Sequence, residues 1–284
     1  MNKKNIRVIP RMDIKGPNLV KGIHLEGLRV LGSPEEFSKY YYENGADELL
    51  YMDVVASLYG RNSLFDIIQR TAKHAYIPLT VGGGIRGIED IRTALRAGAD
   101  KVCLNTAAVR NPELIQSASK RFGSSTIVIA IEAIKQPDGR YLAFTDNGRE
   151  ETGLDAFEWA QQAEALGAGE IVATSVDREG TGSGYDCEFV RRMADSLSIP
   201  VIAHGGPGNA RHVQEVVTMG RADAVAVASI LHYHYIQLRN DTFSSSSEGN
   251  TEFLKRGSQS RRLAPSSISA IKECVRSETL DCRV

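Results

Sequence analysis

The chain has 284 residues, of which 42% are hydrophobic and 24% charged, and its formal net charge is −1. These are ordinary globular values, and the length suits one α/β barrel with an extension better than two separate domains. The charge balance gives no reason to expect a nucleic acid or an anionic membrane as a partner.

Two further features point to a cytoplasmic protein. The N-terminal segment MNKKNIRVIPRMD lacks a secretory core, and no apolar run reaches the length of about 18 residues that a membrane span needs. The four cysteines form no CxxC pair and no metal-ligand spacing, so we expect reduced thiols and neither a metal nor a cofactor. They are Cys103, Cys187, Cys274 and Cys282.

Short β-branched runs alternate with amphipathic segments along the chain. The expected strands are residues 6–12, 48–53, 77–81, 101–105, 126–132, 170–175, 199–203 and 223–228. Segments between them, such as PEEFSKYYYENGA, IEDIRTALRAGA and AFEWAQQAEALGAGE, repeat apolar residues at the three- and four-residue spacing of a helix. Strands that each precede a helix in this way predict a single (β/α)8 TIM barrel rather than an open sheet.

The sequence contains an internal duplication. Residues 77–109 resemble residues 199–231, with Ile77-Pro78 matching Ile199-Pro200 at an offset of 122 (199 − 77). The duplication predicts two similar half-barrels. Each copy has a strand that ends in glycines and a second strand that ends in small polar residues. Two such copies suggest a ligand with a phosphate at each end.

These repeated positions are suited to binding phosphate. Glycine lets backbone N–H groups approach an anion, and a following helix N-terminus adds a favourable field. Glycines in a tight βα turn also have a purely structural interpretation, but the paired occurrence favours phosphate. The candidates are Gly83, Gly84, Asn105, Thr106, Gly205, Gly206, Ala228 and Ser229.

Two carboxyl groups, Asp13 and Glu132, follow expected strands that face each other across the barrel mouth. An opposed pair suits general acid/base catalysis, with one proton donor and one acceptor. Alternatively, the two carboxylates cap helices or pair with Lys15 and Lys135. The symmetric placement beside two phosphate loops favours catalysis.

Charged residues also stand at the opposite ends of the strands, at positions 7, 48, 101 and 170. Because side chains alternate along a strand, Arg7 points to the same side as Asp13, and Lys101 to the same side as Asn105. If that side is the interior, Arg7, Lys101, Glu48 and Glu170 converge at the bottom of the barrel. Such a ring is either purely structural or a gated polar passage.

The C-terminal part departs from the barrel pattern. We expect residues 1–238 to form the barrel, residues 239–264 a flexible Ser-rich insertion, and residues 265–284 a closing helix and tail. Ser266 or Ser267 is the expected N-cap of that helix. The insertion is interpreted as a loop, with a docking segment as the alternative.

Together these motifs closely resemble the HisF family, the cyclase subunit of imidazole glycerol phosphate synthase. The resemblance runs from about Ile6 to Tyr235. It is carried by RVIPRMDIKGPNLVKG, ADELLYMDVVAS, VGGGIRGIEDI, GADKVCLNTAAV, AIEAIK, FTDNGREETGLD, GAGEIVATSVDREGTGSGYD and DAVAVASILHY. It implies a barrel that uses ammonia from a glutaminase partner resembling HisH, bound at the N-terminal face.

The resemblance also implies a reaction. The ammonia reacts with a doubly phosphorylated ribulosyl aminoimidazole carboxamide (PRFAR), giving imidazole glycerol phosphate and the aminoimidazole carboxamide ribotide of purine synthesis (AICAR). Asp13 matches one catalytic aspartate, and Glu132 occupies the position of the other. The four charged residues match an ammonia gate, and Lys21 matches a lysine of a mobile first loop that helps to hold substrate. The further expected substrate contacts are Asp53, Asp177, Glu179, Gly180 and Thr181.

The chain departs from the family pattern at several mouth positions. Glutamate replaces the usual aspartate at Glu132 and Glu179, and His204 stands where a small residue is usual. Arg11 and Met12 replace the usual Cys and Leu. The alternatives to the cyclase are therefore a HisF-like subunit that passes ammonia to another amidotransferase, such as one that amidates a surface sugar, and a non-catalytic activator of a glutaminase.

Overall fold

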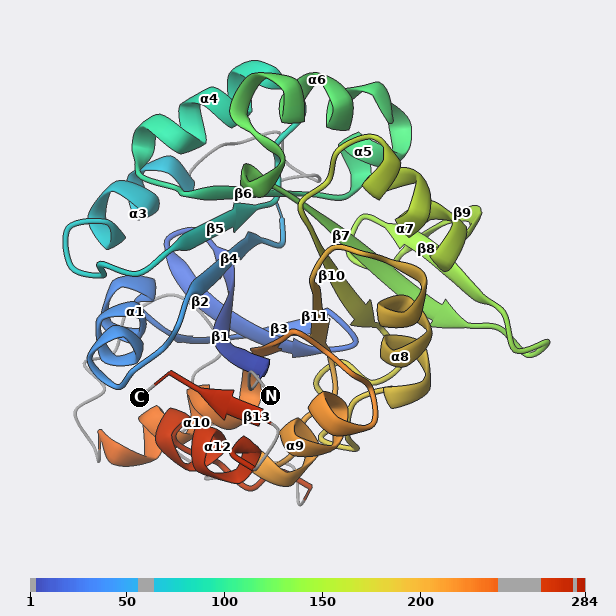
Figure 1. The fold of residues 1–284 in the computed structure, drawn as a ribbon. Helices are drawn as coiled ribbons and strands as arrows, with labels where there is room; N and C mark the ends of the chain where they lie inside the picture. The colour runs from blue at the N-terminus through green and yellow to red at the C-terminus, as the bar shows by residue number, and fades with distance from the viewer. Residues whose placement is uncertain (1–3, 56–63, 240–261, 278–279, 284) are drawn as a thin grey trace.

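The β-branched runs form a closed ring of parallel strands in the computed structural model (Figure 1). The structure describes residues 4–55, 64–239, 262–277 and 280–283. In these ranges the ring order is β1, β4, β5, β6, β7, β10, β11 and β12, and β12 pairs with β1 to close it. The bounds are Lys4–Lys15, Leu49–Asp53, Leu79–Gly82, Lys101–Leu104, Ile127–Lys135, Glu170–Ser175, Val201–His204 and Ala224–Val227. The predicted (β/α)8 barrel is confirmed.

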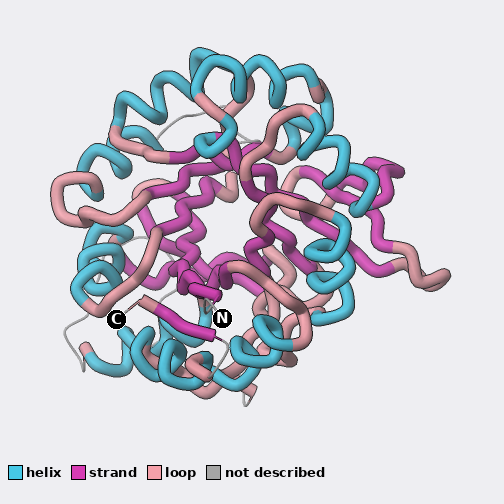
Figure 2. The backbone as a smooth tube through the Cα atoms, in the orientation of Figure 1, coloured by secondary structure: helices cyan, strands magenta, loops and turns pink. Residues whose placement is uncertain are grey.

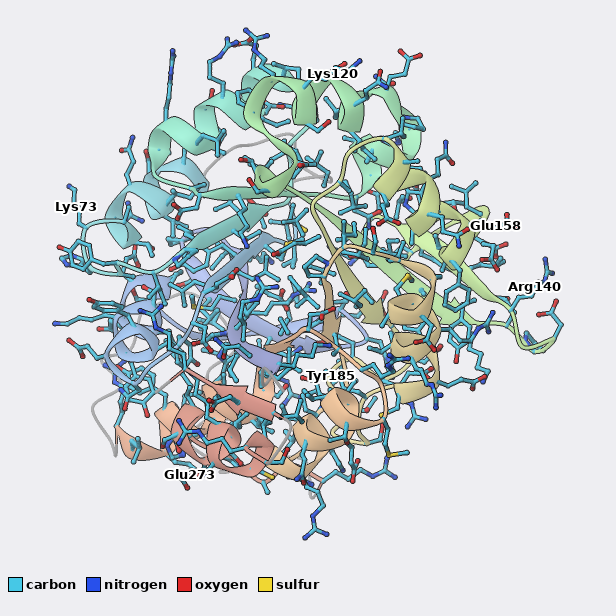
Figure 3. All side chains as sticks on the ribbon, in the orientation of Figure 1. Lys73, Lys120, Arg140, Glu158, Tyr185 and Glu273 are labelled. Carbon is cyan, nitrogen blue, oxygen red and sulfur yellow. The ribbon has the colours of Figure 1, made fainter. Side chains whose placement is uncertain are left out.

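Helices surround this ring (Figure 2). They are α1 Pro34–Glu43, α3 Leu64–Thr71, α4 Ile88–Ala97, α5 Thr106–Arg110, α6 Glu113–Phe122, α7 Ala156–Ala165, α8 Cys187–Ser196, α9 Ala210–Thr218, α10 Ser229–Leu238 and α12 Ile268–Val275. Each of the longer helices packs an apolar face on the strands, as Ile91 and Ala94 of α4 do. Charged side chains such as Lys120 and Glu158 lie on the outer rim (Figure 3).

Two antiparallel hairpins extend the barrel beyond its predicted elements. β1 continues past the ring and pairs with β2 (Asn18–Ile23), which pairs with β3 (Glu26–Gly32). In the same way β7 pairs with β8 (Tyr141–Thr145), which pairs with β9 (Glu150–Asp155). The hairpins follow the first strand of each half-barrel, so they extend the internal duplication.

Strand alternation divides the core into two parts. One cluster, which includes Ile9, Leu50 and Val172, fills the barrel interior, and a larger cluster lies between the strands and the helices. On β1 the inward positions are therefore Arg7, Ile9, Arg11 and Asp13.

The C-terminal segment closes the N-terminal side of the fold. Ser267 caps α12 by accepting a hydrogen bond from the Ala270 N–H, which confirms one of the two predicted N-caps. β13 (Leu280–Cys282) pairs in parallel with the start of β1, and Lys272 forms a buried ion pair of 2.8 Å with Asp47. Most of the expected insertion, residues 240–261, lies outside the described residues.

Candidate active site

The two predicted carboxyl groups lie at the barrel mouth, on the opposed strands β1 and β7. Both are buried, Asp13 at 2% and Glu132 at 3% exposure. The Gly148 N–H, in the turn between β8 and β9, donates a hydrogen bond of 2.9 Å to Glu132 Oε2. Burial raises the pKa of Glu132 to about 7, despite the opposing effects of Arg11 and this hydrogen bond. Glu132 is therefore able both to give and to take a proton near neutral pH.

Asp13 is held by a buried cation that the sequence does not place in the site. Arg11 Nε donates to Asp13 Oδ1 at 2.9 Å, and Arg11 Nη1 lies 3.0 Å from His204 Nδ1. Thr174 Oγ1 is 3.2 Å from the same imidazole nitrogen. Asp13, Arg11, His204 and Thr174 thus form one buried chain of polar contacts across three strands. Neither Lys15 nor Lys135 provides the predicted alternative partner, since Lys135 pairs with Glu188 at 3.0 Å.

The first glycine loop opens into a cavity of about 370 Å³. Gly83 and Gly84 adopt φ values of +88° and +71°, and a Cβ on Gly83 would lie 2.2 Å from the Asp53 carbonyl oxygen. Only glycine fits this backbone, which leaves its N–H groups accessible to a ligand. The cavity is lined by the predicted Asp53, Gly83, Gly84, Asn105, Thr106 and Glu132, together with Arg86, Arg110, Asp146 and Asn147, which were not predicted.

The second glycine loop also has two glycines with positive φ, but the space beside it is nearly filled. Gly205 and Gly206 have φ values of +91° and +121°, and a Cβ on Gly206 would lie 2.1 Å from the Gly184 carbonyl oxygen. The cavity at this loop is only about 10 Å³. Its lining contains the predicted Lys21, Glu179, Gly180, Gly205, Gly206, Ala228 and Ser229, with His204.

A buried ion pair fills this region and fixes the β2–β3 hairpin. Lys21 Nζ donates to Glu179 Oε1, and the Leu25 N–H donates to Glu179 Oε2 at 3.0 Å. The His24 N–H donates to the Glu179 carbonyl oxygen, also at 3.0 Å. The first loop, expected to be mobile, is a regular hairpin docked on the segment after β10 in this state.

Two predicted contacts lie away from these cavities. Asp177 is exposed and accepts a hydrogen bond of 2.9 Å from the Lys135 N–H, where it lines a different, outer cavity. The Thr181 hydroxyl bonds within its own turn, to the Arg178 carbonyl oxygen at 2.7 Å.

At the other end of the barrel, the four charged residues converge as strand alternation predicts. Arg7 Nη1 lies 2.6 Å from Glu48 and 2.9 Å from Glu170. Lys101 Nζ lies 3.1 Å from Glu48 and 3.2 Å from Glu170. Cations and anions thus alternate around a ring, which satisfies the charges that burial would otherwise penalise.

Other features of the described residues bear on the class of protein. No helix among them is long and apolar enough to cross a bilayer, and no cluster of three or more His, Cys, Asp or Glu in those ranges is arranged to hold a metal ion. His232, in the segment His232-Tyr233-His234, is buried. Its Nδ1 lies 2.6 Å from the Tyr41 hydroxyl oxygen, so this histidine has a structural contact.

The protein is thus a duplicated (β/α)8 barrel with two glycine loops and two buried carboxyl groups at its mouth and a ring of charged residues at its base. Comparison with known proteins identifies a family and relatives of similar sequence. The family described as "Histidine biosynthesis protein" matches residues 7–237. The imidazole glycerol phosphate synthase subunit HisF of Legionella pneumophila is 57% identical over 204 residues, 72% of this chain and 96% of the relative. The HisF subunit of Trichormus variabilis is 47% identical over 230 residues, 80% and 90% of the two chains. The chain belongs to the HisF family of histidine biosynthesis proteins.

Proposed function

We propose that this protein is the cyclase subunit of an imidazole glycerol phosphate synthase, which converts PRFAR and ammonia to imidazole glycerol phosphate and AICAR. The observation that carries the proposal is the placement of Asp13 and Glu132 at one mouth, between two glycine loops of matching backbone. A ligand with a phosphate at each end would span the two loops and lie across the carboxyl groups.

The two carboxyls have different surroundings and therefore different roles. Asp13 is paired with Arg11, whereas Glu132 forms no ion pair with a residue of the described ranges and has a pKa of about 7. We assign to Glu132 the proton transfers of ammonia addition and ring closure, because efficient acid/base catalysis needs a pKa near the working pH. Asp13 supplies a fixed negative charge that stabilises cationic intermediates.

The charged ring at the base is the proposed entrance for ammonia. Arg7, Glu48, Lys101 and Glu170 join the interior to the N-terminal face, on the side away from the carboxyls. A glutaminase subunit of the HisH type bound at this face would release ammonia into the barrel.

One observation favours a second candidate function, an ammonia-conducting subunit for a different amidotransferase. The Arg11 guanidinium lies in the interior beside Asp13, so part of the carboxylate is occupied before any substrate binds. A subunit that no longer catalyses cyclisation would tolerate this arrangement.

Turnover of PRFAR with an ammonium salt at alkaline pH tests the two candidates. The cyclase consumes PRFAR, and Asp13→Asn abolishes the activity. Glu132→Asp tests whether glutamate simply replaces the usual aspartate at this position. Retained or higher activity indicates a simple replacement, and complete inactivation indicates that the pocket requires the longer side chain. Absence of wild-type turnover at saturating PRFAR would exclude the cyclase and leave the second candidate.

A further inference from the structure

Arg11 and His204 are buried mouth residues that the proposed mechanism does not use directly. Both belong to inward positions of their strands, at the junction between the Asp13 carboxylate and the second glycine loop. Arg11 is 2% and His204 3% exposed. Burying a guanidinium and an imidazole is unfavourable unless their N–H groups are hydrogen-bonded, so their presence at the mouth suggests that they bind a ligand.

The contacts of Arg11 fix the protonation of His204. A guanidinium can only donate, so the imidazole Nδ1, 3.0 Å from Arg11 Nη1, must be the acceptor. Burial, followed by the charges of Arg11 and Lys21, lowers the pKa of His204 well below its ordinary value, so the ring is neutral. A neutral ring with an accepting Nδ1 carries its proton on Nε2. His204 is therefore the Nε2–H tautomer.

Two N–H donors of this pair remain available. Arg11 Nη2 is buried and makes no hydrogen bond with any described residue. The hydrogen bonds of His204 to described residues both use Nδ1, and His204 lines the cavity at the second glycine loop. A buried cationic donor without a partner is destabilising, and a hydrogen bond to a ligand oxygen would remove this cost.

We propose that Arg11 and His204 form an anion clamp, in which Arg11 holds His204 as the Nε2–H donor and both side chains bind oxygen atoms of a phosphate at the second glycine loop. The clamp rests on the proposed function only in that the bound phosphate would be one of the two phosphates of PRFAR. It makes the two phosphate sites chemically unequal. The first loop has Gly82 where the second has His204, and a Cβ at Gly82 would lie 2.5 Å from Met52 Sδ, so no comparable side chain fits there.

Nitrogen-15 NMR of the whole protein tests the clamp, with inorganic phosphate as the probe. The His204 signals are those missing from His204→Asn, and His74→Asn, at an exposed position, is the matched control. In wild type we expect the proton on Nε2, no titration of the ring through neutral pH, and a shift of the Nε2 signal when phosphate is added. Arg11→Met should weaken phosphate binding at this loop about tenfold, the loss expected for a charged hydrogen bond.

Several outcomes would overturn the clamp. They are a proton on Nδ1, a charged ring at neutral pH, and a His204 signal that phosphate leaves unmoved, whether or not the Gly205 and Gly206 amides shift. The His204 nitrogen signals of the wild-type protein test the clamp even if the Arg11→Met variant fails to fold. A clamp that responds to phosphate in a protein that does not turn over PRFAR contradicts the proposed function alone.

Discussion

At the scale of single residues, the mouth is organised by burial of charge. Glu132, Asp13, Arg11 and His204 are all nearly inaccessible, and burial raises the pKa of Glu132 to about 7. The two carboxyl groups have different partners among the described residues: Arg11 donates directly to Asp13, whereas the Gly148 N–H donates to Glu132 at 2.9 Å.

The raised pKa of Glu132 makes a prediction about stability. The pKa rises from 4.5 in the unfolded chain to about 7 in the folded protein, so stability falls as the pH increases through this interval. Glu132→Gln removes the cost of ionising a buried carboxyl group, and the glutamine side-chain oxygen can still accept the hydrogen bond from the Gly148 N–H. It should match wild type below pH 4.5 and be more stable above pH 7 by on the order of 3 kcal/mol.

Urea unfolding of both proteins across this pH range measures the difference. Glu188→Gln is the control, because Lys135 lowers the pKa of this exposed carboxyl and its pH dependence has the opposite sign. An equal effect of Glu132→Gln at all pH values would show that the pKa of Glu132 is the same in the folded and the unfolded protein, which would contradict the effect of burial.

Sequence reasoning reaches some of these residues and not others. Asp13, Glu132 and the glycine pairs follow from strand ends and from the duplication. The Arg11–His204 contact joins residues 193 positions apart and depends on the stagger of β1 against β11, which the pattern along one strand does not contain. The family resemblance makes Asp177 an expected substrate contact, but in the structure it is exposed in the turn after β10 and accepts a hydrogen bond from the Lys135 N–H.

At the scale of elements, the two hairpins complete the site. β8–β9 brings the Gly148 N–H to Glu132, and β2–β3 brings Lys21 to Glu179. The periodicity of the sequence predicts barrel strands well because they are continuous apolar runs. The outer hairpin strands, β3 and β9, are short and largely exposed, so the hydrophobic pattern there is weak.

We expect Glu179 to hold the β2–β3 hairpin closed. Glu179→Ala leaves the buried Lys21 ammonium with the Gly22 carbonyl oxygen but without its counter-charge, and it removes the acceptor of the Leu25 N–H. The expected loss is about 3 kcal/mol or more, as for a broken buried pair. Amide hydrogen exchange in residues 18–32 should then accelerate at least about tenfold, while the barrel strands keep their protection. Asp138→Ala, in the exposed turn before β8, is the control. Unchanged exchange in the hairpin would show that its backbone pairing with β1 is sufficient.

At the scale of the whole molecule, the barrel separates two chemical ends. The mouth carries the two carboxyl groups and the glycine loops, and the base carries the alternating ring of Arg7, Glu48, Lys101 and Glu170. Because the ring is far along the strands from the carboxyls, substitutions there should affect the delivery of ammonia and not its chemistry.

Lys101→Met tests this separation. It leaves Glu48 and Glu170 with Arg7 alone. Glutamine-dependent turnover with a HisH-type glutaminase should fall about tenfold, equivalent to about 1.4 kcal/mol of barrier, while turnover with an ammonium salt is preserved. Lys4→Met removes an exposed cation at the same end of the barrel and should alter neither. An equal loss of turnover with glutamine and with the ammonium salt would show that Lys101 stabilises the fold and has no specific role in the delivery of ammonia.

The central claim is that PRFAR and ammonia react at this mouth. Its most direct test is a reaction of the purified protein with PRFAR and 15N-labelled ammonium, followed by NMR of the products. We expect the label to enter imidazole glycerol phosphate, AICAR to form in equal amount without label, and the Asp13→Asn variant to form neither product. Recovery of unchanged PRFAR from the wild-type protein at saturating concentrations of both reactants would contradict it.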